Sequence, residues 1–175
     1  IHERFPTVQH LAVHLENHQR IYFNEQNNLQ EILENPRTTT LTGFFELCSI
    51  DEFATTLLYS EVPTYYRWCE NTRKFMRRKQ GESVPGHPGI KKSQAIGRVY
   101  TVHPNQSECF HLRMLLHHIR GPKSWECLKT VNHVVYPTFK ATCLALGLLE
   151  NDDQWKHCLS DAALSESPSK LRDLF

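Results

Sequence analysis

The chain has 175 residues, 39% of them apolar, and its 20 Lys and Arg residues nearly balance its 19 Asp and Glu residues. A chain of this size and composition can bury a core as one domain, or as one domain with a small subdomain. The net charge of +1 argues neither for nor against a nucleic-acid partner. No apolar run of roughly 18 residues occurs, so we expect no membrane span.

The first part of the chain, residues 7–102, is rich in Thr, Val, Tyr and Phe, which predicts mainly strands. The segments with strand character are Val8–Leu15, which partly alternates, and His18–Phe23, which follows a polar turn. A short helix is expected over residues 28–33 and ends near Pro36. Two further segments stay open: residues 39–48 fit either a strand or the start of a helix, and residues 53–58 are ambiguous.

The middle of the chain predicts a β-hairpin followed by a loop. Residues 62–69 and 75–78 flank Asn71-Thr72, the expected turn of that hairpin. The segment from Gly81 to Gly89 holds three Gly and two Pro in nine positions, which indicates a loop. Residues 95–102 predict another strand.

Residues 107–175 predict successive short helices. Leu112, Leu115 and Ile119 recur at helical spacing, and Gly121-Pro122 is expected to end that helix. Trp125–Val131 predicts a second helix, and Pro137 suits the first turn of a third, which Gly147 closes. A last helix is expected from Ser167. The aromatic residues expected to pack between these helices are Trp125, Tyr136, Phe139 and Trp155.

The order of these elements predicts an α+β fold, with mainly short antiparallel strands in the N-terminal half and several short helices in the C-terminal half. We divide it into a strand-rich subdomain, residues 1–105, which carries a basic hairpin and the Gly/Pro loop, and a helical subdomain, residues 106–175. A start at Ile1 and an end inside an expected helix favour one compact unit cut from a larger protein.

Several segments, in order, resemble the Helitron rolling-circle transposases. The similarity is densest over residues 110–149, and it is loosest over residues 1–35. The other matching segments are TTTLTGFFELC (38–48), YSEVPTYYRW (59–68), residues 73–79, IGRVY (96–100), Trp155 and SPSKLRDLF (167–175). The resemblance implies the region just upstream of a petite-integration-frequency-type helicase. It further implies a nuclear parent protein that nicks and joins DNA with an HUH nuclease and unwinds it with ATP and Mg.

Catalytic and cofactor motifs are not expected in this segment. Gly81 and Gly86 have P-loop spacing, but His87 and Pro88 stand where Lys and Ser or Thr are needed. No His-x-His pair occurs, and the adjacent Tyr65 and Tyr66 would point to opposite faces of a strand. We therefore predict no catalytic residue and no cofactor here, so the segment itself is not an enzyme.

Cysteine and histidine residues do not predict a metal site. Six Cys residues are scattered through the chain without a dense framework, which favours reduced thiols in an intracellular compartment. The nearest cluster is Cys109 and His111 with His117 and His118, but the first two diverge by about 200° on a helix. We interpret these residues as buried Cys and surface His. His117, His118 and Arg120 also suit the C-terminal end of a helix.

Basic charge concentrates in one window, residues 67–98, which holds nine Lys and Arg against two Glu, a local net charge of +7. Cations neutralise phosphates and aromatic faces stack unpaired bases. The predicted DNA contacts are Arg73, Lys74, Arg77, Arg78, Lys79, Lys91, Lys92 and Arg98, with Tyr66 or Trp68 for stacking. The alternative is a solvated hairpin that balances acidic residues elsewhere in the chain.

Two functions follow as expectations. The first is a non-catalytic DNA-binding and coupling region that guides single-stranded DNA between the nuclease and the helicase of the same polypeptide. The second is a protein–protein docking module between those two parts, without DNA contact, which predicts an exposed apolar patch of several hundred Å².

Overall fold

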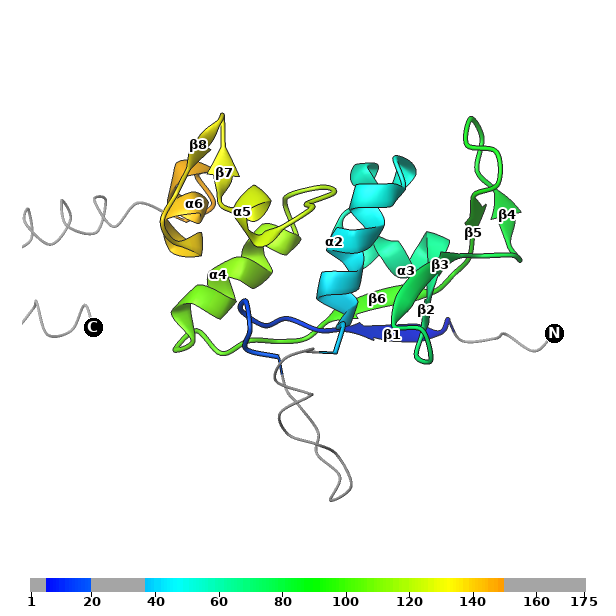
Figure 1. The fold of residues 1–175 in the computed structure, drawn as a ribbon, viewed down its shortest axis with the longest axis horizontal. Helices are drawn as coiled ribbons and strands as arrows, with labels where there is room; N and C mark the ends of the chain where they lie inside the picture. The colour runs from blue at the N-terminus through cyan, green and yellow to red at the C-terminus, as the bar shows by residue number, and fades with distance from the viewer. Residues whose placement is uncertain (1–5, 20–36, 150–175) are drawn as a thin grey trace, which may run out of the picture.

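The computed structural model of the chain describes residues 6–19 and 37–149. Strand β1 (Val8–Leu11) pairs with β6 (Ile96–Val99) along one edge of the molecule, and helix α2 (Thr40–Ile50) stands against this pair (Figure 1). The hairpin strands β2 to β5 lie on one side of α2. Helices α4 to α6 lie on its other side (Figure 1).

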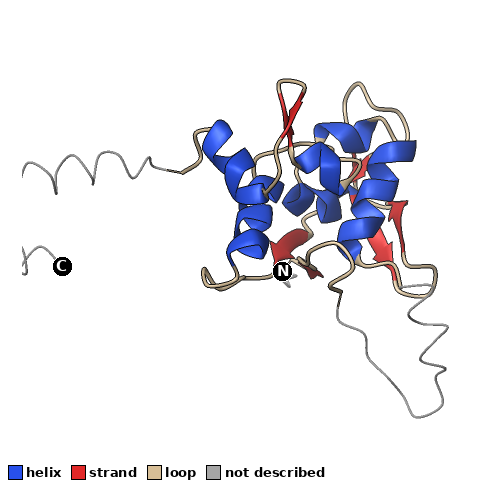
Figure 2. Ribbon diagram, turned by 60° about the vertical axis from the view of Figure 1, so that its left-hand side comes forward, coloured by secondary structure: helices blue, strands red, loops and turns tan. Residues whose placement is uncertain are grey.

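The predicted α+β fold class is confirmed, with short strands in the N-terminal half and short helices in the C-terminal half. The strand pairs are separate and two-stranded, and the helices occupy much of the molecule between them (Figure 2). Three pairs are antiparallel: β2 (Tyr66–Cys69) with β3 (Lys74–Arg77), β4 (Glu82–Ser83) with β5 (Lys91–Lys92), and β7 (Thr130–Val131) with β8 (Val134–Val135). The β1–β6 pair is parallel, which the sequence did not predict.

Residues 39–48, for which strand and helix both stayed open, form helix α2. Thr39 caps its N-terminus in a capping box: the Thr39 hydroxyl accepts from the Thr42 N–H at 3.3 Å, and the Thr42 hydroxyl accepts from the Thr39 N–H at 2.9 Å. Five apolar residues of α2 recur at helical spacing and are buried, namely Leu41, Phe44, Phe45, Leu47 and Cys48, whereas Ile50 at its end is exposed. The threonine run is therefore a helix start.

The segment after α2 turns twice before the first hairpin. Residues 53–58, which were ambiguous, form the 3-10 helix η1 (Phe53–Thr56), and a second one, η2 (Tyr59–Glu61), follows. The predicted strand over residues 62–69 is wrong in its first half, which is the short helix α3 (Val62–Tyr65). Pro63 lies in the first turn of α3, where its fixed φ favours a helix.

Other strands are shorter than predicted or lie elsewhere. The strand expected over residues 8–15 ends at Leu11, and the one expected over residues 95–102 ends at Val99. The predicted loop of residues 81–89 includes a two-residue strand, β4, which pairs with β5. The helix expected over residues 28–33 lies outside the described residues, as does most of the strand expected over residues 18–23.

The C-terminal half begins with α4 (Ser107–Leu116), which ends well before Gly121, the predicted stop. Helix α5 (Trp125–Leu128) is shorter than the predicted helix because a β7–β8 hairpin follows it, turning at Asn132 and His133 with φ of 49° and 67°. Helix α6 (Phe139–Ala145) begins after its N-cap Thr138, so Pro137 precedes the helix instead of lying in its first turn.

The end of α6 agrees with the prediction, because Gly147 has φ of 67° and its N–H donates to the Leu144 carbonyl. Glu108 on α4 fixes the other end, where its carboxylate accepts from the Phe139 N–H at 2.9 Å. Phe139 is buried, and Trp125 packs against the core as expected. Trp155 and the helix expected from Ser167 lie outside the described residues.

One hydrophobic cluster joins both halves of the described chain. Leu11, Phe44 and Tyr66 from the N-terminal half and Leu112 and Leu128 from the C-terminal half belong to it. Backbone contacts reinforce this connection, because the Gly121 N–H donates to the Leu57 carbonyl at 3.0 Å. The helices therefore pack on the strand-rich part and share its core.

A buried hydrogen-bond chain fixes the start of α2 against β1 and η2. The hydroxyls of Thr40 and Tyr59 lie 2.8 Å apart, and Thr40 accepts from the Ala12 N–H at 2.8 Å. The Tyr59 hydroxyl donates to the Ala12 carbonyl at 3.0 Å. Tyr59 is fully buried, and burial raises the pKa of its hydroxyl, which stays a neutral donor.

We expect Tyr59→Phe to destabilise the protein by about 1–3 kcal/mol, because it leaves the Ala12 carbonyl and the Thr40 hydroxyl buried without this partner. Urea unfolding measures the change. Tyr100→Phe is the matched control, since Tyr100 is 54% exposed, and should be nearly neutral. Equal stability of the two variants would contradict a structural role for the Tyr59 hydroxyl.

Candidate nucleic-acid interface

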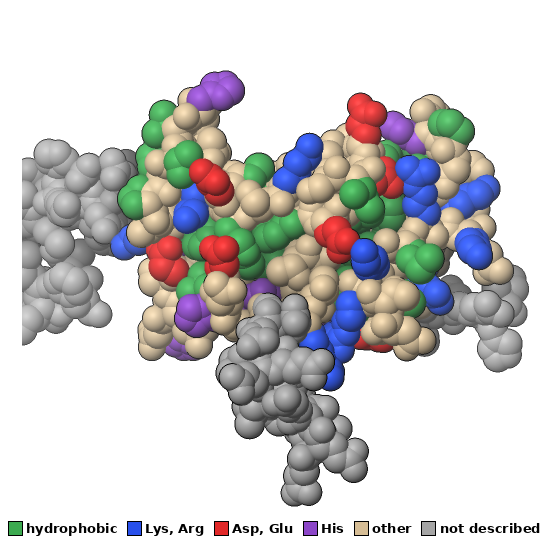
Figure 3. All heavy atoms as spheres, in the orientation of Figure 1, with side chains coloured by type: hydrophobic (Ala, Val, Ile, Leu, Met, Phe, Trp, Pro, Cys, Tyr) green, Lys and Arg blue, Asp and Glu red, His purple; other side chains and the backbone are tan. Residues whose placement is uncertain are grey.

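The predicted hairpin is present, and it places the basic window on one part of the surface. β2 and β3 pair in antiparallel register, with Arg67 opposite Met76 and Trp68 opposite Phe75. Lys and Arg side chains gather on the half of the molecule that β2 to β5 form (Figure 3). This surface is the candidate nucleic-acid interface, and the cations of the basic window fall into three groups according to their partners.

Two of the predicted DNA contacts are already engaged with α2. Lys74 Nζ lies 2.7 Å from Glu46 Oε1, and Arg77 Nε lies 2.8 Å from Asp51 Oδ2. Their charges are therefore largely neutralised within the protein. This outcome reduces the effective charge of the hairpin below the +7 of the sequence window.

Asp51 is the junction between α2, η1 and the hairpin. Its backbone N–H donates to the Leu47 carbonyl, and its Oδ1 accepts from the Phe53 N–H at 3.1 Å. Burial alone would raise the pKa of Asp51, but the hydrogen bonds and charge of Arg77 outweigh burial and lower it below the ordinary value of 3.8. The Asp51–Arg77 pair therefore stabilises the folded state at neutral pH.

We expect Asp51→Asn to lower stability at pH 7 by about 0.5–1 kcal/mol, the range of a partly exposed ion pair. Because the folded-state pKa is depressed, this contribution is present above 3.8 and is lost as pH falls through the folded-state pKa. Urea unfolding at pH 7 and at about pH 3 should show the difference from wild type shrinking in acid. Asn retains the acceptor for Phe53, so a difference that is equal at both pH values would point to packing instead of charge.

Two other predicted contacts are partly engaged. Arg78 is half-buried, its Nε donates to the Pro63 carbonyl at 2.9 Å, and burial with nearby Arg67 lowers its pKa. Lys91 Nζ donates to the Ser83 hydroxyl at 2.7 Å. The cations of the basic window that form no ion pair within the described part of the chain are Arg67, Arg73, Lys79, Lys92 and, on β6, Arg98.

The structure corrects the prediction that Tyr66 or Trp68 stacks on a base. Tyr66 is fully buried and Trp68 is only 7% exposed, so neither presents a face to a nucleobase. Both point to the same face of β2, and α2 covers that face: a Cβ on Gly43 would lie 2.6 Å from the Trp68 ring. The Tyr66 hydroxyl is buried beside the Asp51–Arg77 pair, and burial raises its pKa.

Aromatic groups that the sequence did not select surround a cleft beside the basic strands. Phe53 of η1, Tyr65 of α3 and His87 of the Gly/Pro loop line it, and Lys92 and Arg120 lie at its rim. No local pattern links these residues, because they come from three segments that meet only in the folded chain. The predicted pairing of Tyr65 and Tyr66 on opposite strand faces does not apply, since Tyr65 ends a helix.

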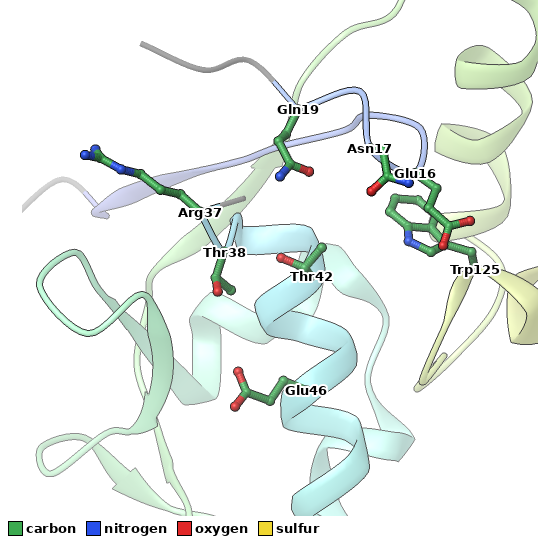
Figure 4. A pocket seen from close by; sticks show the side chains of 8 residues that line it. All are labelled: Glu16, Asn17, Gln19, Arg37, Thr38, Thr42, Glu46 and Trp125. Carbon is green, nitrogen blue, oxygen red and sulfur yellow. The ribbon is translucent and has the colours of Figure 1, made fainter. Parts of the chain in front are cut away.

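A second hollow, of about 340 Å³, lies at the start of α2 (Figure 4). Thr42 and Glu46 of α2 line one wall, while Glu16 lies beside Trp125 on the other (Figure 4). Its carboxylates disfavour a phosphate, and Glu46 already binds Lys74. This hollow is therefore a weaker candidate for a nucleic-acid contact than the basic surface.

The interpretation of the Cys residues as buried and the His residues as surface groups is correct only in part, since Cys127 is exposed and His111 is buried. Arg120, expected at the end of a helix, instead donates to Glu61 and to the Thr56 carbonyl, both at 2.7 Å. His111 is buried, and its Nδ1 lies 2.6 Å from the Ser107 carbonyl oxygen. Within residues 6–19 and 37–149, no group of three His, Cys, Asp or Glu side chains is placed to hold a metal ion. The five Cys residues of these ranges are free thiols.

No protein-family model matches the chain, and no curated protein matches it significantly. Among the described residues, no helix has both the length and the apolar character needed to cross a membrane.

Proposed function

We propose that this chain is a non-catalytic single-stranded DNA-binding region of a Helitron-type transposase, which couples the HUH nuclease to the 5′-3′ helicase of the same polypeptide. The family part of this proposal rests on the ordered sequence resemblance. The DNA-binding part rests on one structural observation: five cations from the β2–β3 hairpin, the following strands and their loops have no ion-pair partner among the described residues.

Shape and charge together favour a single strand over a duplex. The described helices are mostly buried on their apolar faces, and α6, the helix after Pro137, buries Phe139, Thr142 and Cys143. Such a helix has few polar side chains free to read a major groove. Short, exposed strands and loops with dispersed cations instead suit a flexible backbone of phosphates.

The test is fluorescence anisotropy of the chain with a labelled single strand of about 20 nucleotides across a salt series. Each phosphate contact contributes roughly 0.7 to the slope of log affinity against log salt on single strands. Five contacts would therefore give a slope of about 3.5. A folded sample that does not bind at low salt would refute the proposal.

A second function is favoured by a different observation. Val134 and Val135 on β8 are 54% and 53% exposed, and Leu144 on α6 is 47% exposed. β8 and α6, which carry these side chains, lie away from the basic hairpin (Figure 1). They suit a protein–protein docking surface, and a folded chain that lacks DNA binding but binds the separately prepared nuclease or helicase part would favour this function.

A further inference from the structure

The cleft beside the basic strands has the size of a ligand site. Its volume is about 520 Å³, and ligand clefts typically measure about 300–1,000 Å³. Its walls come from η1, α3 and the β4–β5 hairpin, so three separate elements converge on one space. The lining also includes the apolar side chains Leu57, Val84 and Pro85, the polar Thr56 and Thr64, and Glu61, whose carboxylate binds Arg120.

Three rings give the cleft its chemistry. The Phe53 ring lies 5.0 Å from the Tyr65 ring at 79°, and 4.7 Å from the His87 ring at 58°. Phe53 and Tyr65 are half-buried, and His87 is exposed on the Gly/Pro loop. Aromatic side chains that line an open cleft can stack on an unpaired base of any type, because every base has a π-face.

The cations at the rim differ in availability. Arg120 is bound to Glu61 and the Thr56 carbonyl, which fixes its guanidinium and neutralises its charge. Lys92 lines the same cleft and forms no ion pair among the described residues. The ammonium group of Lys92 is therefore the cleft's cation that has no ion-pair partner among the described residues.

The cleft is also continuous with the basic hairpin. A Cβ placed on Gly89, two residues after His87, would lie 3.8 Å from an Arg77 guanidinium nitrogen. The Arg78 N–H donates to the Tyr65 carbonyl at 3.2 Å, and the Ser93 N–H donates to the Thr64 carbonyl at 2.9 Å. A strand that follows the cations of the hairpin would therefore pass the mouth of the cleft.

We propose that this cleft holds one unpaired nucleobase of a single strand among the rings of Tyr65, Phe53 and His87, with a neighbouring phosphate at Lys92. The inference rests on the proposed single-stranded DNA function and adds the site at which a base, as opposed to a phosphate, is bound. Its side chains replace Tyr66 and Trp68, which are buried, as the stacking group.

The test compares an oligothymidine strand with an abasic strand of equal length, which keeps the phosphates and removes the bases. Stacking is worth about 1–3 kcal/mol per base, so the full chain should bind oligothymidine roughly 5- to 150-fold more tightly than the abasic strand. Tyr65→Leu should reduce this ratio at least about five-fold and leave the salt slope unchanged. Tyr65→Phe, which keeps the ring, should retain the ratio.

A second variant tests the same cleft in case Tyr65→Leu does not fold. His87→Ala changes an exposed loop residue, so it should lower the same ratio without altering the unfolding midpoint. Equal affinity of wild type for both strands would overturn the base-binding cleft while leaving the proposed DNA function intact. A ratio that survives both Tyr65→Leu and His87→Ala would also overturn it, and the base would then bind elsewhere.

Two further outcomes would each overturn the cleft proposal. No binding of either strand by the folded chain would overturn both the cleft proposal and the proposed function. Binding of a proline-rich peptide that depends on Tyr65, without base-dependent binding of a strand, would assign the cleft to a peptide and overturn the nucleobase proposal.

Discussion

Replacing Lys79 and Lys92 together by Gln is expected to weaken single-stranded DNA binding roughly 25-fold at about 0.1 M salt and to reduce the salt slope by about 1.4. Both side chains are exposed, and neither forms an ion pair among the described residues. Each would release counterions from one phosphate on binding, and the two contributions should add. Anisotropy titrations across a salt series measure both quantities.

The matched control removes the same charge at another place. Lys123→Gln with Lys140→Gln changes two exposed Lys residues of the C-terminal half, so the net charge falls by the same amount. The control should keep the wild-type salt slope. If both double variants weaken binding equally, the total charge and not the β2–β5 surface governs binding, and the proposed interface is wrong.

A second control separates free cations from paired ones. Lys74→Gln with Glu46→Gln removes an ion pair as a unit and leaves the net charge unchanged. If Lys74 is neutralised within the protein, this variant should bind the strand like wild type. A salt slope reduced by about 0.7 would instead show that Lys74 leaves Glu46 to contact a phosphate.

Gly97→Ala is expected to destabilise the fold by about 2–3 kcal/mol, a typical cost of overpacking a closely packed site. A Cβ on Gly97 would lie 2.3 Å from the Ser60 carbonyl oxygen and 3.0 Å from both Leu11 Cδ1 and Pro63 Cδ. A backbone oxygen cannot move aside as a flexible side chain can, so β6 would have to shift away from η2. For a chain of this length the loss corresponds to a fall in Tm of roughly 4–12 °C.

Gly86→Ala is the comparison for that variant. Gly86 has φ of +78° but no atom within 4 Å of an added Cβ, so only backbone strain opposes the substitution. Its cost should be about 1 kcal/mol. A Gly97→Ala variant as stable as Gly86→Ala would show that β6 and η2 are less closely packed than the structure indicates.

The proposed interface depends on which charges the fold leaves free. Lys74 and Arg77 belong to the basic window by sequence, but they form ion pairs with Glu46 of α2 and with Asp51 at its C-cap. The acidic partners are 28 and 26 positions away along the chain. Counting charges in the sequence window therefore overestimates the positive charge that this surface offers to DNA. The slope of log affinity against log salt would measure how many cations take part in binding.

The sequence by itself determined the elements that depend on neighbouring residues. The Asn71-Thr72 turn between two β-rich segments predicted the β2–β3 hairpin, and Gly147 predicted the end of α6. The succession of strands and then helices predicted the α+β class, and the cluster of Lys and Arg predicted a basic surface. In each case the signal is a turn residue, a period or a composition within about 15 positions.

Only the tertiary structure decided which face of each element is buried and which other elements it packs against. Alternation in β2 places Tyr66 and Trp68 on one face, but a strand has two faces. Only the packing of α2 against β2, with Gly43 of α2 beside the Trp68 ring, buries that face. The parallel pairing of β1 with β6 and the meeting of Phe53, Tyr65 and His87 likewise join distant segments. Such contacts form because apolar area is buried between elements far apart in the chain, and no local pattern specifies which partner provides it.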